Sequence, residues 1–230
     1  CTTLLTILKR EARLMGHHFS FSVCGPHADW AEEKLQKAFE EIARIEALLT
    51  TFSEGSQTAL INRNAGIKPV AVDAEVFGLI QRSIRISDLT QGAFDITYGG
   101  IDKDLWNFNT QLKSLPTPAV AKQLVRLINY KNIELDEKGQ TVFLKEAGMR
   151  IGFGGIGKGY AAEMAKRVLK HLGVNSGVVN AAGDLAVWGV QPNGQPWTIG
   201  IADPNGQRHP FSHLAITDMA VATSGNYEKY

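Results

Sequence analysis

The amino-acid sequence predicts an α+β fold, in which mixed sheets are flanked by helices. Three features lead to this prediction. The 230 residues are 44% hydrophobic and 20% charged, which is typical of a globular protein and excludes wholesale disorder. Amphipathic helical stretches dominate the first half of the chain, and short strands dominate the second half. The two kinds of element do not alternate regularly, so a doubly wound parallel sheet is disfavoured.

The first part of the chain predicts one strand and one long helix. Residues 18–23 alternate apolar and polar side chains, which is typical of a strand. In residues 29–49, apolar side chains recur at helical spacing among charged ones, so we expect a helix whose apolar stripe contacts the core. Residues 53–69 are polar and contain two glycines, which predicts a loop or short turns.

Three more helices are expected, and short strands begin after the helix at 116–128. Residues 74–90 form a second amphipathic helix, and Gly92 is placed to cap its end. Two prolines open a third helix over 116–128, because proline is tolerated in a first helical turn. A fourth is predicted over 158–172. Short strands bounded by turn residues are expected at 132–136, 141–145, 149–153, 178–180, 184–190, 197–202, 211–217 and 220–222.

Charge and cysteine content disfavour several classes of protein. The 24 basic and 23 acidic residues give a net charge of +1, so nothing in the charge balance favours nucleic-acid binding. No apolar run approaches the roughly 20 residues that span a bilayer. Two cysteines, Cys1 and Cys24, are too few for a disulfide framework. An N-terminal cysteine fits a bacterial lipoprotein that carries a lipid on this thiol after signal removal, and it fits a trimmed chain equally well.

A glycine-rich loop at residues 152–160 provides the first functional lead. It follows a predicted strand and opens a predicted helix, and its glycines let a ligand approach the backbone amides. A helix N-terminus supplies unpaired N–H groups and a partial positive charge, and Lys158 adds a full charge. Together these features indicate an anion site, with phosphate as the usual ligand. The alternative is a tight strand-to-helix crossover that binds nothing.

Two general phosphate motifs fit this loop poorly. Residues 152–158 match the pattern G-x-x-x-x-G-K, but Gly159 stands where a P-loop needs Ser or Thr for magnesium. The dinucleotide pattern G-x-G-x-x-G can also be placed here, but no acidic residue ends a second strand about 20 positions later. A P-loop nucleotide hydrolase is therefore kept only as a weak alternative.

A family resemblance fits better. Residues 154–162 read GGIGKGYAA, which resembles the motif D-[LF]-G-[GA]-I-[AG]-K-G-Y-A of the FAD:protein FMN transferases, the ApbE family. Other segments resemble further motifs of this family and occur in the family's order. These segments are 14–16, 49–62, 92–106, 179–184, 196–204 and 222–227.

This resemblance implies an activity and a fold. A relative of this family would cleave the diphosphate of FAD and attach FMN to a Thr or Ser hydroxyl of an acceptor protein, with Mg²⁺ present and AMP released. The implied fold is a single ApbE-like domain over residues 1–230. The family's C-terminal blocks, which carry metal ligands, are expected to be missing from this chain. The resemblance also implies a location for the protein: the bacterial cell envelope, on the periplasmic side of the inner membrane, with the cytoplasm as the alternative.

The resemblance also implies a set of binding residues. By analogy with the family, Gly152 and Lys158 belong to the loop that binds the flavin nucleotide, and the carbonyl of Gly155 is one magnesium ligand. No catalytic residue is predicted. The residues expected to wrap around the flavin nucleotide are Met15, Phe52, Ala93, Phe94 and Asp95.

Each of these assignments has a simpler structural alternative. On composition alone, Met15 and Phe52 fit plain core residues. Asp95 would equally cap a turn or the element that follows it. Lys158 fits a solvated first-turn lysine, although a cation is unfavourable at that end of a helix unless an anion is near.

Three positions depart from the family pattern. Gly152 replaces an Asp that contacts the flavin nucleotide in relatives, so one polar contact and one charge are missing. Phe52 stands where Tyr is common, and it keeps a ring for stacking but has no hydroxyl. Ala182 replaces a glycine, which costs little unless the backbone needs a positive φ. Together with the missing C-terminal blocks, Gly152 keeps a second function open, that of a flavin-binding or storage protein with little turnover.

Overall fold

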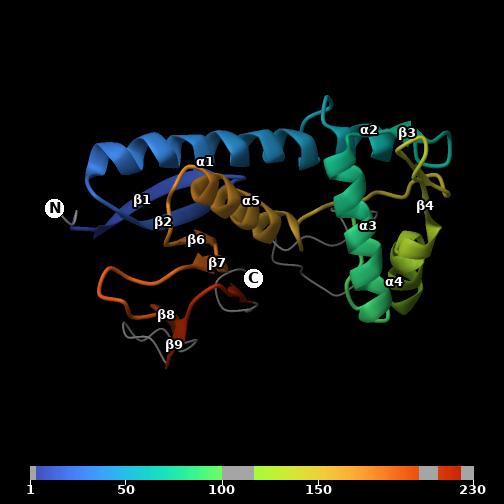
Figure 1. The fold of residues 1–230 in the computed structure, drawn as a ribbon. Coiled ribbons are helices and arrows are strands. Elements are labelled where there is room, and N and C mark those ends of the chain that lie inside the picture. The colour runs from blue at the N-terminus through green and yellow to red at the C-terminus, as the bar shows by residue number, and fades with distance from the viewer. Residues whose placement is uncertain (1–3, 100–116, 202–211, 224–230) are drawn as a thin grey trace. The chain divides into compact units, whose positions relative to one another are not determined.

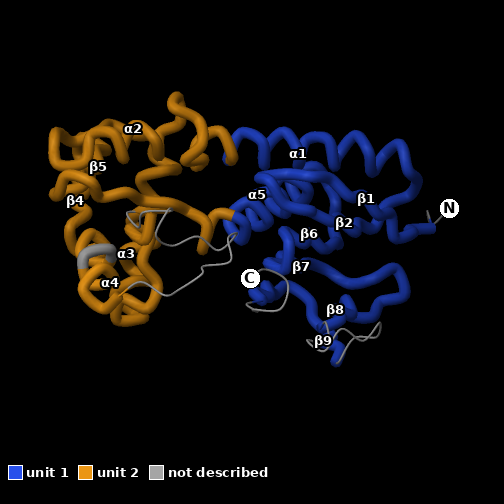
Figure 2. Tube along the Cα trace, turned by 180° about the vertical axis from the view of Figure 1, so that it is seen from behind, with its two compact units in different colours: residues 1–45, 158–228 blue, residues 46–157, 229–230 orange. Residues whose placement is uncertain are grey.

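The computed structural model describes residues 4–99, 117–201 and 212–223 (Figure 1). The chain divides into two compact units (Figure 2). Unit 1 consists of residues 1–45 and 158–228, and unit 2 consists of residues 46–157 and 229–230. The α+β prediction is confirmed, because helices and several antiparallel sheets occur together. The prediction of a single domain over residues 1–230 stays a prediction.

Unit 1 is built on a five-stranded antiparallel sheet. Its strand order is β1-β2-β6-β7-β10. The long helix α1 (Ala28–Leu49) begins in this unit, and α5 (Gly157–His171) lies beside it, since both helices line one surface groove. The strands are β1 (Thr6–Leu14), β2 (His17–Gly25), β6 (Gly177–Ala181), β7 (Asp184–Trp188) and β10 (Ala220–Ala222), and β8 (Trp197–Ile201) pairs with β9 (Ser212–Ile216) as a separate hairpin.

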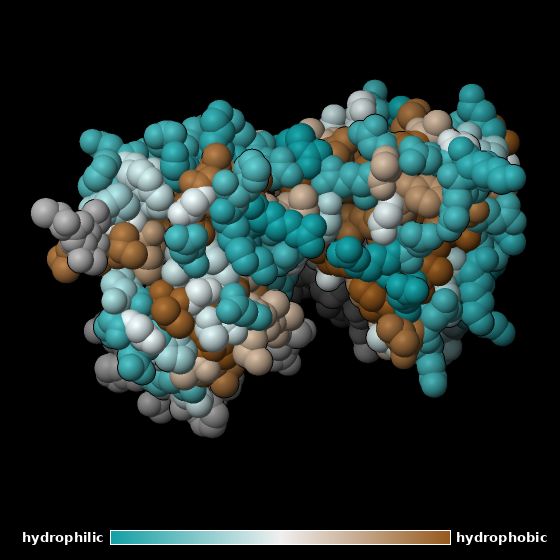
Figure 3. Space-filling model, viewed as in Figure 1, coloured by the Kyte–Doolittle hydropathy of each residue, from teal (hydrophilic) through white to brown (hydrophobic). Residues whose placement is uncertain are grey.

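Alternation along β2 divides the core of unit 1 between the two faces of the sheet. Phe19, Phe21 and Val23 are buried on one face, and the Phe21 ring meets Phe39 of α1 edge-on at 5.0 Å between ring centroids. On the opposite face, Cys24 belongs to a second apolar cluster that also contains Trp197 of β8. Each face of this sheet is therefore covered by an apolar layer, and hydrophilic side chains cover the outer side of α1 (Figure 3).

The polar side chains buried near the end of β7 all have hydrogen-bond partners. The Ser176 hydroxyl donates to the carbonyl of Val190 at 2.5 Å and accepts from Trp197 Nε1 at 3.0 Å. The indole of Trp188 donates to the carbonyl of Val174 at 2.8 Å. Because buried polar groups destabilise a protein only when they lack partners, this network holds β8 against the main sheet without a penalty.

Unit 2 packs helices against a small sheet of order β3-β5-β4. The middle of its core is formed by Ile80 of α3, Val142 of β5 and the extended residues Met149 and Ile151, which are all fully buried. The elements are α2 (Gln57–Arg63), β3 (Val70–Ala71), α3 (Ala74–Leu89), α4 (Pro118–Leu124), the 3₁₀ turns Val125–Leu127 and Tyr130–Asn132, β4 (Ile133–Asp136) and β5 (Thr141–Leu144).

Most predicted elements are confirmed, usually to within one or two residues at each end. The helices predicted over 29–49, 74–90 and 158–172 correspond to α1, α3 and α5. The third predicted helix corresponds to α4 and the 3₁₀ turn after it, although residue 116 lies outside the described part of the chain. Seven of the eight predicted late strands are also confirmed where they are described.

Two sequence predictions in unit 2 are wrong. The stretch 53–69 contains the helix α2, whose N-cap is Ser56; the Ser56 hydroxyl accepts from the N–H of Ala59 at 3.0 Å. Residues 149–153 do not form a strand, because their only ladder contact among the described residues is an isolated parallel bridge between Tyr98 and Arg150.

The ends of two other elements also differ from the prediction. Helix α3 ends at Leu89 with Thr90 as its C-cap, and the first left-handed residue is Gln91, at φ 53°, followed by Gly92 at φ 83°. Gly92 therefore contributes the second left-handed residue rather than the cap itself. The sequence also gave no indication of β1, whose nine residues are exposed or only half-buried.

None of the described helices combines the length and the apolar composition that a membrane-spanning helix requires.

Candidate functional site

The residues that lead into the glycine loop are held by the side chain of Asn62. Asn62 Nδ2 donates to the carbonyl of Ile151 at 3.0 Å, and Asn62 Oδ1 accepts from the Ile151 N–H at 2.8 Å. The next residue, Gly152, donates its N–H to the carbonyl of Ile96 at 2.9 Å. Since Ile151 is fully buried, these bonds pair backbone groups that water does not reach. The start of the loop is therefore fixed by a residue 89 positions away in the sequence.

The glycine loop makes a tight turn into α5. The N–H groups of Ile156 and Gly157 both donate to the carbonyl of Phe153, at 3.1 and 2.6 Å. Gly154 and Gly155 are exposed at the turn. The first N–H groups of α5 have no carbonyl four residues earlier within the helix, as at every helix start. Both amides of the turn therefore already donate within the loop, and the anion site expected from the sequence stays a prediction.

Two aromatic side chains from residues 94–98 lie against this turn. A Cβ atom added to Gly155 would lie 3.2 Å from Cε2 of Phe94. One added to Gly154 would lie 2.5 Å from the hydroxyl of Tyr98, and this hydroxyl accepts a hydrogen bond from the Gly154 N–H at 3.1 Å. A side chain at position 154 would therefore require the Tyr98 phenol to move away from the turn.

The Asp95 side chain acts within its own turn. Its Oδ1 accepts from the N–H of Thr97 at 2.8 Å and from the Thr97 hydroxyl at 2.7 Å, and its Oδ2 accepts from the Tyr130 N–H at 3.0 Å. The structural alternative for Asp95 is thus observed, and this cap positions the neighbouring Phe94. Ala93, which precedes Phe94, is exposed.

Tyr130 also belongs to this turn. The Asp88 carboxylate accepts from the Tyr130 hydroxyl and raises the pKa of the phenol, and burial adds to the effect. The phenol therefore stays protonated as a donor to Asp88.

Phe52 and Met15 are not buried core residues. Phe52 lies in the turn between α1 and α2, and 88% of it is exposed, so its ring is accessible for stacking. Met15 is half-buried and lies in unit 1, in the two-residue turn between β1 and β2, where Met15 and Gly16 have φ values of 52° and 72°. Two consecutive positive φ values match the twist of a tight hairpin.

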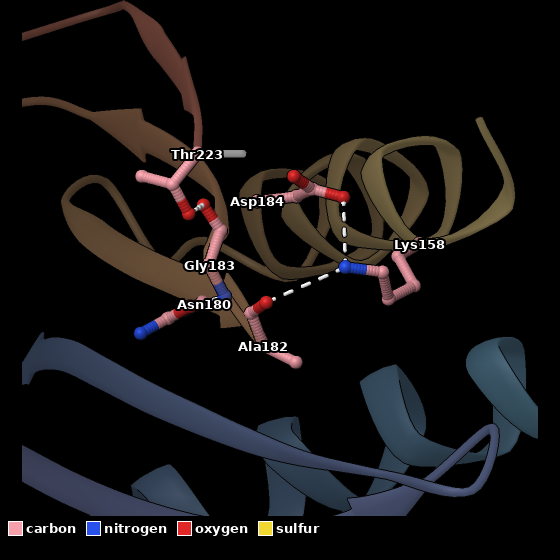
Figure 4. A network of polar contacts seen from close by, with 6 residues as sticks. All are labelled: Lys158, Asn180, Ala182, Gly183, Asp184 and Thr223. Atoms are coloured by element: carbon pink, nitrogen blue, oxygen red, sulfur yellow. Dashed lines mark hydrogen bonds and ion pairs between the residues drawn. The ribbon is translucent and has the colours of Figure 1, made fainter. Parts of the chain in front are cut away.

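Lys158, in the first turn of α5, contacts the turn between β6 and β7 (Figure 4). Its ammonium lies 3.2 Å from Oδ2 of Asp184 and 3.4 Å from the carbonyl oxygen of Ala182. Only about a fifth of each charged side chain is exposed, 23% for Lys158 and 20% for Asp184. The carboxylate supplies the anion that a cation needs at a helix N-terminus, so Lys158 is not a solvated surface lysine.

The β6–β7 turn is itself fixed by two hydrogen bonds. The Gly183 N–H donates to Asn180 Oδ1 at 2.8 Å, and the Gly183 carbonyl accepts from the Thr223 hydroxyl at 2.9 Å (Figure 4). Ala182 and Gly183 have φ values of 50° and 99°. The segments 179–184 and 222–227, predicted as separate motifs, therefore meet at Gly183 within their described residues, and Lys158 contacts the neighbouring Ala182 and Asp184.

Replacing Ala182 by glycine is expected to stabilise the chain. Alanine at a positive φ places its Cβ too close to the backbone, and glycine removes this strain, with a gain of about 1 kcal/mol. Urea unfolding of the full chain measures the change. As a control, Ala220→Gly on β10 should instead destabilise, because residue 220 has ordinary strand geometry, where glycine only adds entropy to the unfolded chain. A loss of stability in Ala182→Gly would contradict this account.

The described residues do not by themselves form a magnesium site. Among them, no three His, Cys, Asp or Glu side chains lie close enough together to hold a metal ion. Gly155, whose carbonyl is the predicted ligand, lies on the exposed turn, and the Asp95 carboxylate already accepts three hydrogen bonds.

Comparison with known proteins supports the resemblance suggested by the sequence. The sequence model of the ApbE family matches residues 15–230. The chain belongs to the ApbE family. This match includes the hairpin turn at Met15, the hydrogen bonds between Asn62 and Ile151, the glycine loop and the β6–β7 turn. All these contacts therefore lie within the region that the family shares.

Several ApbE relatives are FAD:protein FMN transferases. That of Klebsiella pneumoniae (strain 342) is 33% identical over 200 residues, which are 86% of this chain and 61% of the relative. That of Treponema pallidum (strain Nichols) is 27% identical over 210 residues, covering 85% of this chain and 58% of the relative. The chain spans about three fifths of the length of these curated relatives.

The solved structures of ApbE proteins confirm the fold. The crystal structure of the ApbE protein of Thermotoga maritima MSB8 has a TM-score of 0.85 and 29% identity, and the match covers 97% of this chain and 72% of that one. The flavin transferase ApbE of Vibrio cholerae also has a TM-score of 0.85, at 21% identity over 97% of this chain and 72% of its own. The ApbE-like fold expected from the resemblance is therefore confirmed.

The structure reveals contacts that sequence reasoning missed. Asn62 and Thr223 occur in segments that resemble family motifs, but no sequence pattern predicts the contacts that they make. Tyr98 was not singled out at all, although it follows the Asp95–Thr97 turn directly. Its contact with Gly154 joins residues 56 positions apart, and no pattern of spacing in a single sequence reveals such a pair.

Proposed function

We propose that this chain is the FAD-binding part of a flavin transferase that attaches FMN to an acceptor protein. The observation that supports this most strongly is the match of the ApbE family over residues 15–230, which includes the glycine loop at the start of α5. Several relatives that match this chain are FAD:protein FMN transferases. Because the chain spans only part of those relatives, the activity itself is our proposal.

The proposed reaction is a phosphoryl transfer to a Thr or Ser hydroxyl of the acceptor. The hydroxyl oxygen forms a bond to the phosphorus of the FMN half of FAD and loses its proton. The bond between that phosphorus and the bridging oxygen of the diphosphate breaks, and AMP leaves with the bridging oxygen. Chemistry of this kind depends on positioning and on neutralising phosphate charge rather than on a protein nucleophile.

Residues of this chain fit the binding part of that task. We propose that the Gly155 amide and the first amides of α5 after Gly157 bind the diphosphate, because the Gly154, Ile156 and Gly157 amides already donate within the protein and the helix dipole favours an anion at this end. Lys158 contributes a full positive charge, and Asp184 fixes its position at 3.2 Å. Phe52, with 88% of its surface exposed, is proposed to stack on the flavin ring, and Phe94 to contact the nucleotide beside the glycine loop. For Met15, in unit 1, a contact with the flavin nucleotide is implied by the resemblance alone.

We also propose that the transfer requires Mg²⁺, a proposal that rests on the family resemblance alone. When bound, the ion would neutralise phosphate charge. Its ligands other than the proposed Gly155 carbonyl are not among the described residues. Adding EDTA to the transfer reaction should abolish it, and an excess of Mg²⁺ should restore it.

Intact-mass spectrometry of an acceptor protein tests the proposed activity. The chain is incubated with FAD, Mg²⁺ and an acceptor domain from the same organism, and the acceptor should gain the mass of one FMN minus water. A parallel sample with FMN in place of FAD should show no gain, because FMN has no diphosphate to cleave. An acceptor that stays unmodified with FAD would contradict transfer by this chain.

A second function is favoured by Gly152, where the family motif has Asp and this chain has no side chain. We propose as the alternative a protein that binds or stores FAD with little or no transfer. The acceptor experiment separates the two, because a storage protein retains FAD but leaves the acceptor mass unchanged.

Location in the bacterial cell envelope, with a lipid on Cys1, is a further proposal from the resemblance and the N-terminal cysteine. Cys1 lies outside the described residues. Fractionation of cells that express the native gene would place the protein in the membrane fraction, and Cys1→Ser should release it. Recovery of the unaltered protein in the cytoplasmic fraction would contradict the proposal.

A further inference from the structure

The phenol of Tyr98 fills the space that a side chain on the glycine loop would need. A Cβ atom at Gly152 would lie 3.3 Å from the Tyr98 hydroxyl oxygen and 3.6 Å from the ring carbon that carries it. At Gly154 the corresponding distance to the hydroxyl oxygen is 2.5 Å. A side chain at either position would therefore require the Tyr98 phenol to shift, by a few tenths of an ångström for position 152 and by more for position 154.

The backbone explains why the ring of Tyr98 comes to the loop. Tyr98 forms a parallel bridge with Arg150, two residues before Gly152, and the Gly152 N–H donates to Ile96 two residues before Tyr98. Residues 96–98 and 150–152 thus run side by side. A long side chain at position 98 that turns toward the loop meets positions 152 and 154, which lie on the same side of the extended chain.

The hydrogen-bonding state of the Tyr98 hydroxyl leaves it able to bind a ligand. Its oxygen accepts from the Gly154 N–H at 3.1 Å, so its own O–H is directed elsewhere. Among the described residues no acceptor for this O–H is found, and 39% of Tyr98 is exposed. The loop therefore presents one polarised hydroxyl donor at its surface, polarised because the amide already donates to its oxygen.

We propose that Tyr98 binds an oxygen of the flavin dinucleotide through its hydroxyl. In this role it replaces the polar contact that the ApbE motif assigns to an Asp at position 152. This inference rests on the proposed function, because it requires that the loop binds FAD. A hydroxyl donates to phosphate or ribose oxygens without adding negative charge. It therefore suits a site for an anionic ligand better than a carboxylate at position 152 would.

The proposed replacement of an Asp at position 152 by the Tyr98 hydroxyl is consistent with the glycine at position 152. A carboxylate at position 152 would have to extend past a Cβ that is already tight against the phenol, at 3.3 Å. An Asp at position 152 would therefore require the Tyr98 phenol to move by a few tenths of an ångström. The absence of the Asp is a change of the group that contacts the ligand, rather than a simple loss.

Titration of FAD with the full chain, followed by flavin fluorescence, tests this inference. We expect Tyr98→Phe to weaken FAD binding by about five- to twenty-fold, because it removes only the hydroxyl and keeps the ring. Gly152→Asp alone should weaken binding as well, because the new side chain collides with Tyr98. The double variant Tyr98→Val with Gly152→Asp should bind FAD within about three-fold of the unaltered chain, because the carboxylate supplies a polar contact and no longer meets the phenol.

Thermal unfolding of each variant separates binding from folding. Tyr98→Phe should unfold at nearly the temperature of the unaltered chain, because water replaces the hydroxyl at the exposed Gly154 amide. The inference is overturned if Tyr98→Phe binds FAD within two-fold of the unaltered chain, or if the double variant binds no better than Gly152→Asp. If the unaltered chain does not bind FAD, the proposed function fails and takes this inference with it.

Discussion

Replacing Asn62 by alanine is expected to destabilise the chain by about 3 kcal/mol. The variant loses both hydrogen bonds to Ile151 and leaves a fully buried N–H and a fully buried carbonyl without partners. Each unsatisfied buried group costs about 1–3 kcal/mol, so two of them account for the estimate. Urea unfolding, followed by far-UV circular dichroism, measures the loss of stability.

Asn64→Ala provides a matched control for this prediction. Asn64 follows the same helix α2, and its Nδ2 donates to the carbonyl of Leu60 at 2.9 Å, but the bond is exposed. Water replaces an exposed partner, so this change should cost less than about 1 kcal/mol. If Asn62→Ala lowers the free energy of unfolding no more than Asn64→Ala does, the hydrogen bonds between Asn62 and Ile151 do not hold the start of the glycine loop.

Replacing Lys158 by alanine is expected to weaken FAD binding by about ten- to thirty-fold. Under the proposed function, the ammonium donates a charge-assisted hydrogen bond to the diphosphate, and the loss of one such bond corresponds to roughly 1.4–2 kcal/mol. The two contacts with Asp184 and the Ala182 carbonyl hold the ammonium in place, so little side-chain entropy is lost when the ligand binds. Fluorescence titration in low salt gives the two dissociation constants.

Two further variants show whether the effect arises from Lys158 itself. Lys166 lies on the same helix and pairs with Glu163 at 2.6 Å, with 19% of its side chain exposed, so Lys166→Ala removes a comparable lysine away from the loop. FAD affinity should not change in that variant. Adding Asp184→Asn to Lys158→Ala removes the unpaired carboxylate, and a full recovery of affinity would show that repulsion by Asp184, rather than loss of Lys158, caused the weakening.

The long, strongly periodic elements were predictable because their burial follows the sequence pattern. In α1, buried residues such as Leu35, Ile42 and Ile45 recur at helical spacing, and in β2 the buried Phe19, Phe21 and Val23 alternate with less buried residues. The missed elements lack that signal. Helix α2 has only seven residues and buries Thr58 and Ile61, and β1 is an edge strand that is largely exposed.

The candidate site was predictable where it is local in sequence. The glycine loop at the start of α5 follows from residues 152–160 alone. The clamp by Asn62, the Tyr98 contact and the pairing of Lys158 with Asp184 join residues that are 89, 56 and 26 positions apart. Such pairs depend on how the chain folds back on itself, and the positive φ of Ala182 likewise depends on the length of a hairpin turn.

Selective ¹⁵N-glycine labelling tests the central claim, that the loop at residues 152–157 binds the dinucleotide. On addition of FAD, the amide signals of Gly154, Gly155 and Gly157 should shift or broaden. The signals of Gly78, in the middle of α3, and of Gly194, in the turn before β8, should stay unchanged. Loop signals that do not move at saturating FAD, while glycines elsewhere do, would contradict the account.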